Sequence, residues 1–315
     1  MPALCAGCDI SPLMPETSIA PALLALPIAS GLAFAFVGVG LRQGQRRGLE
    51  ALHIFVHMGL WGAVFFALSS SGDQWRGVPA LIVGLGIVSG LTQWLAATLV
   101  GVALRLGPLS PMWCAYNLAF VPVALYAAAV FGEPVPPLKI AGLLLAVASV
   151  VFASIRVERQ AGVGAGAVSP FAYGAVLVTL LLLNSVMHIS IKHLGTVATG
   201  EGETLMAAFG PVFFTCLYLG LVTPVAARHA MRRDARAIGR AAWRWGSVAA
   251  LGSIGGVGFL GLSAGLPGAV VFTLSAVFSI LGAGVASVAV FGERVSGVWI
   301  AMMASAVGSV VLVSL

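Results

Sequence analysis

Two groups of aromatic and amide side chains lie inside long apolar stretches, where polar side chains are costly and usually serve a function. Trp113, Tyr116 and Asn117 are spaced i, i+3 and i+4, so they share one face of a helix. Gln93 and Trp94 lie midway along the preceding apolar stretch. Such groups can bind an uncharged or zwitterionic small molecule, and the rings can hold a quaternary amine by cation–π attraction. Anchoring at the membrane interface is the alternative role of the tryptophans.

Asn184 and His188 form a third polar group, four residues apart and therefore on one helix face. The imidazole of histidine titrates near neutral pH, so His188 is a candidate for carrying a proton as well as for binding a substrate. The alternative for this pair is an interhelical hydrogen bond, worth about 0.6 kcal/mol on average inside a membrane.

His53 and His57 also share a helix face, which is a spacing that can bind a metal ion. A zinc site needs at least a third ligand, and Glu50 is expected at the membrane surface rather than beside them. Cys5 and Cys8 form a lone C-x-x-C with no second ligand pair. We therefore expect no metal and no cofactor, and we interpret the two histidines as helix-packing or interface residues.

The amino-acid composition indicates whether these residues belong to a soluble protein or to a membrane protein. Of 315 residues, 60% are hydrophobic and 8% are charged, and the mean hydropathy is +1.06. Soluble domains carry about 25% charged residues, so a soluble globular protein is excluded. The sequence predicts an all-α integral membrane protein with ten transmembrane helices. The expected spans are residues 20–41, 51–70, 78–104, 109–131, 136–155, 170–191, 204–227, 246–266, 269–291 and 298–315.

The basic residues predict an orientation in the membrane. The net charge is +6, and 13 of the 16 Lys and Arg residues fall in alternate loops. By the positive-inside rule these loops face the cytoplasm, which places both termini outside. The same rule accounts for the positive net charge, so the charge does not indicate binding to nucleic acid. Six of the thirteen lie in one stretch, 228–245, interpreted as a loop that retains this side in the cytoplasm. A short interfacial helix on anionic lipid is the alternative for this stretch. The thirteen are Arg42, Arg46, Arg47, Arg105, Arg156, Arg159, Arg228, Arg232, Arg233, Arg236, Arg240, Arg244 and Arg294.

An internal repeat is the strongest signal in the chain. Residues 131–154 match residues 291–314 at an offset of 160, and 14 of the 26 positions from 129 to 154 are identical. Five spans separate the two copies, so they face opposite sides of the membrane as an inverted repeat. The predicted organisation is a tail at 1–19, a five-helix repeat at 20–155, a linker at 156–169 and a second five-helix repeat at 170–315.

The repeat also identifies matched positions. Glu133 and Glu293 each precede a helix, where a carboxylate meets the positive end of the helix dipole; proton coupling is the alternative. Pro122 and its counterpart Gly282 are interpreted as paired bend points. Thr273, the counterpart of Trp113, is a further candidate substrate contact. The counterparts of Tyr116 and Asn117 are apolar, so we expect selectivity to be concentrated in the first half.

Five glycines of the eighth expected span include the pattern G-x-G-x-x-G at residues 256–261. A dinucleotide site would need a strand before it in a soluble βαβ unit, which a membrane helix does not provide. We predict instead that the glycines permit close helix packing or bending. They are Gly252, Gly255, Gly256, Gly258 and Gly261.

The segments ALRLGPLS (103–110), FVPV (120–123) and FGE (131–133), followed by a Gly/Ala-rich helix, resemble an EamA-type domain. Two such domains make a ten-helix member of the drug/metabolite transporter superfamily, and the resemblance covers nearly the whole chain. It implies secondary transport of a small metabolite by alternating access, at a site between the halves. It also implies cytoplasmic termini, whereas the charge pattern places them outside, and this point stays open.

The resulting expectation is a transporter, not an enzyme, in the cell (cytoplasmic) membrane. No Asp or Glu is expected at the middle of any span, so the substrate is expected to be neutral, zwitterionic or amphipathic rather than a polycation. Its partners are that small molecule and the lipid bilayer, with a homodimer left open and no nucleic acid. Two alternatives are an intramembrane histidine-dependent metalloenzyme and a non-transporting accessory or lipid-handling subunit.

Overall fold

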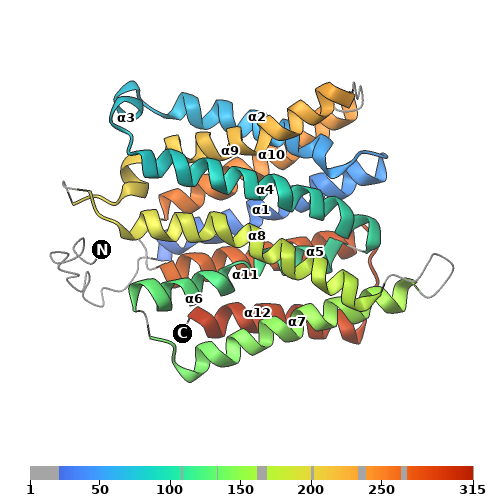
Figure 1. The fold of residues 1–315 in the computed structure, drawn as a ribbon. Coiled ribbons are helices and arrows are strands. Elements are labelled where there is room, and N and C mark those ends of the chain that lie inside the picture. Colours follow the sequence, from blue (N-terminus) through green and yellow to red (C-terminus); the bar gives the residue numbers. More distant parts are fainter. Residues whose placement is uncertain are drawn as a thin grey trace.

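The computed structural model describes residues 21–107, 109–132, 134–161, 169–199, 202–232, 239–263 and 268–314. The expected N-terminal tail, half of the expected linker (162–168) and Glu133 lie outside these ranges, and residues 156–161 of that linker are helical. The described chain is helical, with no strand in these ranges (Figure 1). Its helices are α1 (Pro21–Arg46), α2 (Ala51–Ser69), α3 (Gly72–Gly77), α4 (Ala80–Leu106), α5 (Leu109–Asn117), α6 (Phe120–Phe131), α7 (Pro137–Ala161), α8 (Pro170–Thr196), α9 (Leu205–Arg232), α10 (Arg240–Leu262), α11 (Gly268–Ala289) and α12 (Gly297–Ser314).

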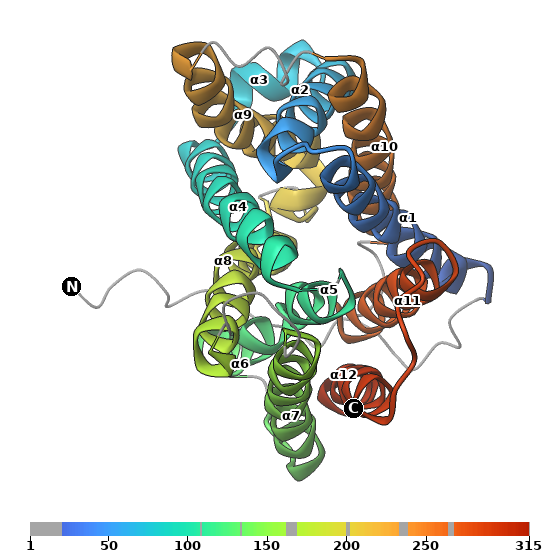
Figure 2. The ribbon, with the colours of Figure 1, turned by 90° about the vertical axis from the view of Figure 1, so that its right-hand side faces the viewer.

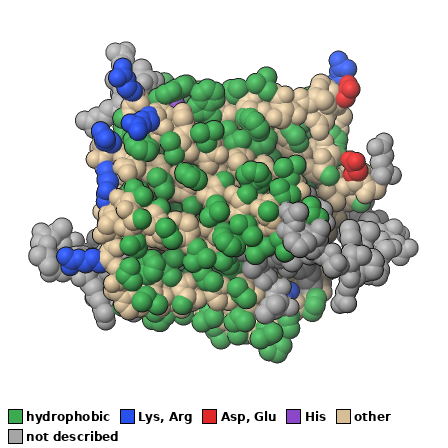
Figure 3. All heavy atoms as spheres, turned by 180° about the vertical axis from the view of Figure 1, so that it is seen from behind, with side chains coloured by type: hydrophobic (Ala, Val, Ile, Leu, Met, Phe, Trp, Pro, Cys, Tyr) green, Lys and Arg blue, Asp and Glu red, His purple; other side chains and the backbone are tan. Residues whose placement is uncertain are grey.

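The lengths and the surface of these helices suit a bilayer. Seven described segments, with α5 and α6 counted as one, are long and apolar enough to cross a membrane, and three shorter apolar helices accompany them. Hydrophobic side chains cover the side of the molecule seen in Figure 3. Leu68 and Phe171 are 82% and 85% exposed, which is stable in lipid but not in water. The protein is therefore a multi-pass helical membrane protein.

The predicted spans agree with the helices except at particular ends. The helix α10 begins at Arg240, six residues before the predicted start, and α9 continues to Arg232, so much of the arginine-rich stretch 228–245 is helical rather than a loop. The short helix α3 was not predicted. It begins with a capping box, in which Ser71 and Gln74 satisfy each other's backbone N–H groups.

The predicted span 109–131 is two helices, α5 and α6, separated at residues 118–119. Pro122 explains the break, because a proline ring clashes with the carbonyl four residues earlier, which here belongs to Leu118. Its repeat counterpart Gly282 lies within the continuous helix α11, and its proposed role as a bend point stays a prediction. A Cβ at Gly282 would lie 2.9 Å from the Cβ of Ala35. This glycine therefore allows α1 to approach α11.

Helices that are distant in sequence pack together around the centre of the molecule. The helix α1 packs against α10 and α11, α4 packs against α8 and α9, α2 packs against α9 and α10, and α7 packs against α12. Figure 2, seen along the helices, shows that α1, α4, α5, α8 and α11 surround a common centre. The two expected halves are therefore interlocked rather than separate lobes.

The two ends of the molecule differ in charge. Lys and Arg side chains gather at one end, here called the basic end, which holds the α1–α2, α4–α5, α9–α10 and α11–α12 junctions (Figure 3). There Glu50 lies 3.3 Å from Arg105 and 3.5 Å from Arg228, and the Arg46 guanidinium donates to the Phe291 carbonyl at 2.7 Å. The opposite end, called the distal end, holds the start of α1 and the end of α12.

The glycines of α10 have opposite roles, which predicts opposite effects of alanine. A Cβ at Gly252 would lie 2.6 Å from the Ala33 carbonyl oxygen, whereas a Cβ at Gly258 would meet nothing within 4 Å. Gly252→Ala should lower the free energy of unfolding by about 1–3 kcal/mol, because α1 must move away. Gly258→Ala should leave it unchanged or raise it by up to about 1 kcal/mol through helix propensity. Thermal unfolding of both purified variants checks this, and equal melting temperatures would contradict it.

Candidate functional site: a central cavity

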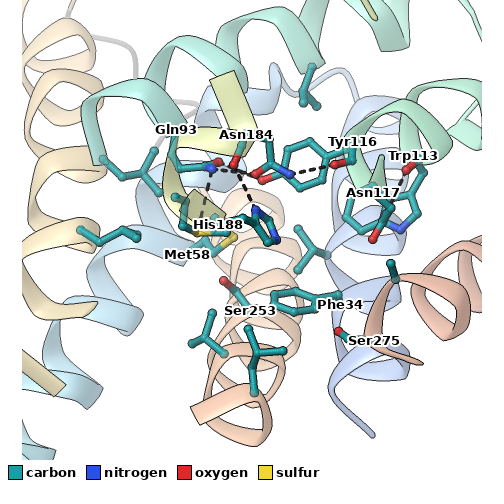
Figure 4. A pocket seen from close by; sticks show the side chains of 18 of the residues that line it. Phe34, Met58, Gln93, Trp113, Tyr116, Asn117, Asn184, His188, Ser253 and Ser275 are labelled. Atoms are coloured by element: carbon teal, nitrogen blue, oxygen red, sulfur yellow. Dashed lines mark hydrogen bonds between the residues drawn. The ribbon is translucent and has the colours of Figure 1, made fainter. Parts of the chain in front are cut away.

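A cavity lies between the halves at the centre of the molecule (Figure 4). The space between its atoms is about 950 Å³ when the open space at its edge is included. Helices from both halves line it. Its lining residues are Phe34, Val37, Leu41, Phe55, Met58, Gln93, Val100, Trp113, Tyr116, Asn117, Phe120, Asn184, Met187, His188, Leu217, Tyr218, Leu221, Ser253, Val257, Leu260, Phe272, Ser275 and Ala276.

A chain of hydrogen bonds joins three of the predicted site residues across α4, α5 and α8. The Gln93 amide donates to Asn184 Oδ1 at 2.7 Å, and the Tyr116 hydroxyl donates to Gln93 Oε1 at 2.8 Å. The Asn184 amide donates to the Tyr116 carbonyl at 2.8 Å. Each amide is fixed by its neighbour, so the orientation of both is set before any ligand arrives.

The face of α5 predicted from sequence spacing is turned to the cavity. The rings of Trp113 and Tyr116 stack with centroids 5.4 Å apart and an interplanar angle of 14°. The Trp113 indole donates to the Ser279 hydroxyl on α11 at 3.0 Å, and the Asn117 amide donates to the Trp113 carbonyl at 2.9 Å. Trp113 is 3% exposed, which excludes the alternative of an interfacial anchor. The stack forms a flat apolar wall with an amide oxygen at its edge.

His188 lies below the amides and is half-buried (Figure 4). Its Nδ1 lies 3.1 Å from the Asn184 carbonyl oxygen, and its ring meets Phe272 edge-on with centroids 6.1 Å apart. Within the described part of the chain, no hydrogen bond is made by Nε2. Because Nδ1 sits beside an acceptor, Nε2 is left as the acceptor of a neutral ring, available to a ligand.

Two predicted contacts are not part of the described lining. Trp94 packs against the core beside the cavity, and its indole N–H is buried with no hydrogen-bond partner among the described residues. The side chain of Thr273 lies outside what the structure describes, although its neighbour Phe272 lines the cavity.

Several lining residues were missed by sequence reasoning. Tyr218 and Ser253 share a hydrogen bond of 2.6 Å, and Ser275 lies 3.0 Å from the hydroxyl of Ser30. Ser253 is the repeat counterpart of Gln93, so the offset of 160 could have identified it. Tyr218 gives no comparable signal, because it is one aromatic residue in an apolar helix. The polar lining is thus shared by both halves rather than concentrated in the first.

The cavity is neutral along its described lining, which holds no Asp, Glu, Lys or Arg. A buried ion without an opposite charge is costly to accommodate. This lining suits a compound that is uncharged or carries its own balancing charge.

The basic end of the cavity is closed. Leu41 is 1% exposed, and Leu109 and Met112 are fully buried. Beyond them the Glu293 carboxylate accepts from the Leu109 N–H at 2.8 Å and from the Ser110 hydroxyl at 2.7 Å. Glu293 therefore caps the start of α5, a contact that the sequence did not predict. The helix that follows, α12, is capped by Ser296, whose hydroxyl accepts from the Trp299 N–H at 3.2 Å.

Toward the distal end the cavity is more open. Phe34, Asn117 and His188 are each half-buried, whereas the lining near the basic end is buried. A second cavity begins there and shares Leu260 and Phe272 with the first. The two cavities are therefore neighbours at this end of the molecule.

The histidine pair of α2 lies away from this cavity. His53 stacks on His229 with ring centroids 4.7 Å apart, and His57 meets Trp243 edge-on at 5.3 Å. Among the described residues, no three His, Cys, Asp or Glu side chains are grouped to hold a metal ion. Both histidines thus take part in the packing of α2 against α9 and α10, and His53 Nδ1 also accepts from the Glu50 N–H at 2.9 Å at the start of α2.

Comparison with known proteins identifies solved structures of similar fold but no family. No family model and no curated protein matches the sequence. Among solved structures, 15 chains match. One is a protein crystal structure that aligns with 92% of this chain and 96% of its own, with a TM-score of 0.61 and 14% sequence identity. The architecture is therefore one that already exists in a solved structure, and at this identity the likeness extends to the fold alone.

Proposed function

We propose that the protein is a secondary transporter of a small neutral, zwitterionic or amphipathic organic metabolite, working by alternating access. The observation that carries this proposal is the central cavity, which is lined by uncharged aromatic and amide side chains from the first and second halves of the chain. Such a cavity at the interface of two repeats is the arrangement that secondary transporters use. The EamA-type resemblance supports the same function.

The packing of the helices supports ten spans in two inverted repeats. In the proposed repeat, α1 corresponds to α8, α2 to α9, α4 to α10, α5–α6 to α11, and α7 to α12. Exchanging each helix with its counterpart turns the α1–α10 contact into the α8–α4 contact. It likewise turns the α2–α10 contact into the α9–α4 contact. It converts the α1–α11 contact into α8–α5 and α8–α6 and leaves α2–α9 and α7–α12 unchanged. A set of contacts preserved by this exchange is what a pseudo-two-fold axis predicts.

Backbone conformation at the helix junctions supports the same symmetry. Gly132 and Gly292, at the two F-G-E copies, have φ of 67° and 66°. Gly48 and Gly202 have φ of 76° and 84°, and each lies three residues before the start of α2 or α9. Positive φ favours glycine, so both pairs of turns require it at matched places.

The charge pattern supports placing the basic end in the cytoplasm of a cell whose inner membrane holds the protein. The cavity then opens outward, and the ends of α1 and α12 also lie outside. The helix α5 is the best candidate for a moving part, because Glu293 holds its first residues, substrate contacts line its middle and a break follows Asn117. His188 is the candidate for proton coupling.

The experiment is transport by purified protein in lipid vesicles against a panel of metabolites chosen by thermal shift. A triple Trp113→Ala, Tyr116→Ala, Asn117→Ala variant should lose at least about tenfold of the wild-type rate, because it loses the wall and an amide of the site. Thr223→Ala is the matched control, since its hydroxyl bonds only to its own helix at Leu219 and lies outside the cavity. Full transport by the triple variant would contradict the site.

A further inference from the structure

The polar side chains of the central cavity differ in how much surface they present to a ligand (Figure 4). Three of them are half-buried, namely Tyr116, Asn117 and His188. The other hydroxyl and amide side chains of the lining are buried, and they are Gln93, Asn184, Tyr218, Ser253 and Ser275. The unpaired atoms of the three half-buried residues therefore decide which hydrogen bonds a ligand can make.

Backbone carbonyls fix the direction of the hydrogen bonds in this wall, because a carbonyl oxygen only accepts. Asn117 bonds to the Trp113 carbonyl at 2.9 Å, so its amide nitrogen is the bonded atom and Oδ1 is left over. The Asn184 amide nitrogen likewise bonds to the Tyr116 carbonyl, which makes Asn184 Oδ1 the acceptor for the Gln93 amide. Gln93 Oε1 then accepts from the Tyr116 hydroxyl. The hydroxyl hydrogen of Tyr116 is thus committed, and only its lone pairs remain.

His188 presents its second ring nitrogen as an acceptor for the same reason. Nδ1 lies 3.1 Å from the Asn184 carbonyl oxygen and must donate to it. The described lining of the cavity holds no carboxylate to stabilise an imidazolium, so the ring is neutral and Nε2 carries a lone pair. Neither Nε2 nor Asn117 Oδ1 is enclosed by protein, as the unpaired indole N–H of Trp94 is. Both acceptors are therefore accessible to a ligand.

Free donors are fewer than free acceptors in this part of the cavity. Among the half-buried residues, Asn117 keeps one amide hydrogen. Tyr218 and Ser253 share a hydrogen bond and keep one hydroxyl hydrogen between them, but they are only 2% and 7% exposed. The accessible polar atoms of the described lining are thus mainly acceptors, and they are complementary to a ligand that carries N–H or O–H groups.

We propose that the central cavity selects flat, uncharged ring compounds that carry N–H or O–H donors, with Asn117 Oδ1 and His188 Nε2 as the acceptors that set this preference. The stacked rings of Trp113 and Tyr116 provide the flat surface against which such a ring packs. A solute of the same shape without donors leaves both acceptors unpaired. This inference narrows the substrate class of the proposed function and rests on it for its biological meaning, whereas binding is measured without transport.

The first test compares three uncharged probes by calorimetry on the purified wild-type protein. Acetophenone has nearly the shape of benzamide but a methyl group in place of the amide NH2, and cyclohexanecarboxamide keeps the amide but not the flat ring. Benzamide should bind about threefold to tenfold more tightly than either, because each comparison removes one kind of contact. Equal affinity for benzamide and either of the other probes, or no binding of benzamide, would overturn the proposal.

The second test assigns the preference to the two acceptors. Asn117→Leu and His188→Phe should each lower the affinity for benzamide about threefold to tenfold and leave that for acetophenone within about twofold. Thr98→Val is the matched control and should change neither affinity. Thr98 is also half-buried, but its hydroxyl donates to the Trp94 carbonyl of its own helix at 3.2 Å, outside the cavity.

The outcomes separate the site from the proposed function. An equal loss of affinity for benzamide and acetophenone in both variants would overturn the assignment of the acceptors. If benzamide is preferred and the preference depends on Asn117 and His188, but no solute is transported, the proposed function fails and the donor-selective site remains.

Discussion

Asn184→Leu should reduce transport at least about thirtyfold while the protein still folds and reaches the membrane. The leucine leaves the Gln93 amide without its acceptor and the Tyr116 carbonyl without its donor. Each buried polar group left unpaired costs about 1–3 kcal/mol, and 1.4 kcal/mol corresponds to a factor of ten. The loss should appear in the rate of substrate uptake by vesicles at equal protein content.

The neighbouring residue supplies the control for this prediction. Ser185 is as buried as Asn184, but its hydroxyl donates to the Leu181 carbonyl of its own helix at 2.7 Å. Ser185→Ala should therefore keep transport within about twofold of wild type. If Asn184→Leu transports as well as Ser185→Ala, the amide network has no part in binding or in the working geometry of the cavity.

Glu293→Gln should open the basic end. The carboxylate makes two charge-assisted hydrogen bonds to the first residues of α5, and a neutral amide makes weaker ones. Losing about 1.5–3 kcal/mol of this interaction shifts a two-state equilibrium about tenfold to a hundredfold toward the form open at the basic end. A cysteine at Ser275, which lines the cavity, reports the shift through faster reaction with an impermeant thiol reagent added from the basic side.

The control lies in the same junction. Ser296→Ala removes the cap of α12 but leaves the bonds of Glu293 to α5 intact. It should lower stability by about 1 kcal/mol without increasing labelling from the basic side. Equal labelling in Glu293→Gln and Ser296→Ala would mean that loosening the junction, not releasing α5, opens the cavity.

Sequence reasoning predicted the helical membrane class because apolar composition and span length are physical requirements of the bilayer. It also found the cavity-facing side of α5, because the spacing of Trp113, Tyr116 and Asn117 defines a helix face. It could not predict the partner of Glu293, since a carboxylate between two helices gives no sign of which helix it caps. It likewise gave no sign that Gly282 allows a close approach of α1 to α11.

The remaining differences have the same physical origin. The break between α5 and α6 appears one turn before Pro122, because the ring acts on the preceding carbonyl rather than at its own position. Trp94 and Gln93 are adjacent in sequence, and only Gln93 lines the cavity. The sequence shows which residues lie in a helix, but the contacts between helices decide which side of that helix meets the cavity.

The central claim, a single cavity reached alternately from both faces of the membrane, is tested by labelling Ser275→Cys in sealed vesicles of both orientations. The background lacks Cys5 and Cys8, while Cys114 and Cys216 are buried. Ser89→Cys is the control, because Ser89 is buried against Ser190 outside the cavity and should stay unreactive from both faces. The account predicts that Ser275→Cys reacts with an impermeant reagent from either face and that a transported solute changes the ratio of the two rates. Reaction from one face alone, with and without solute, would contradict it.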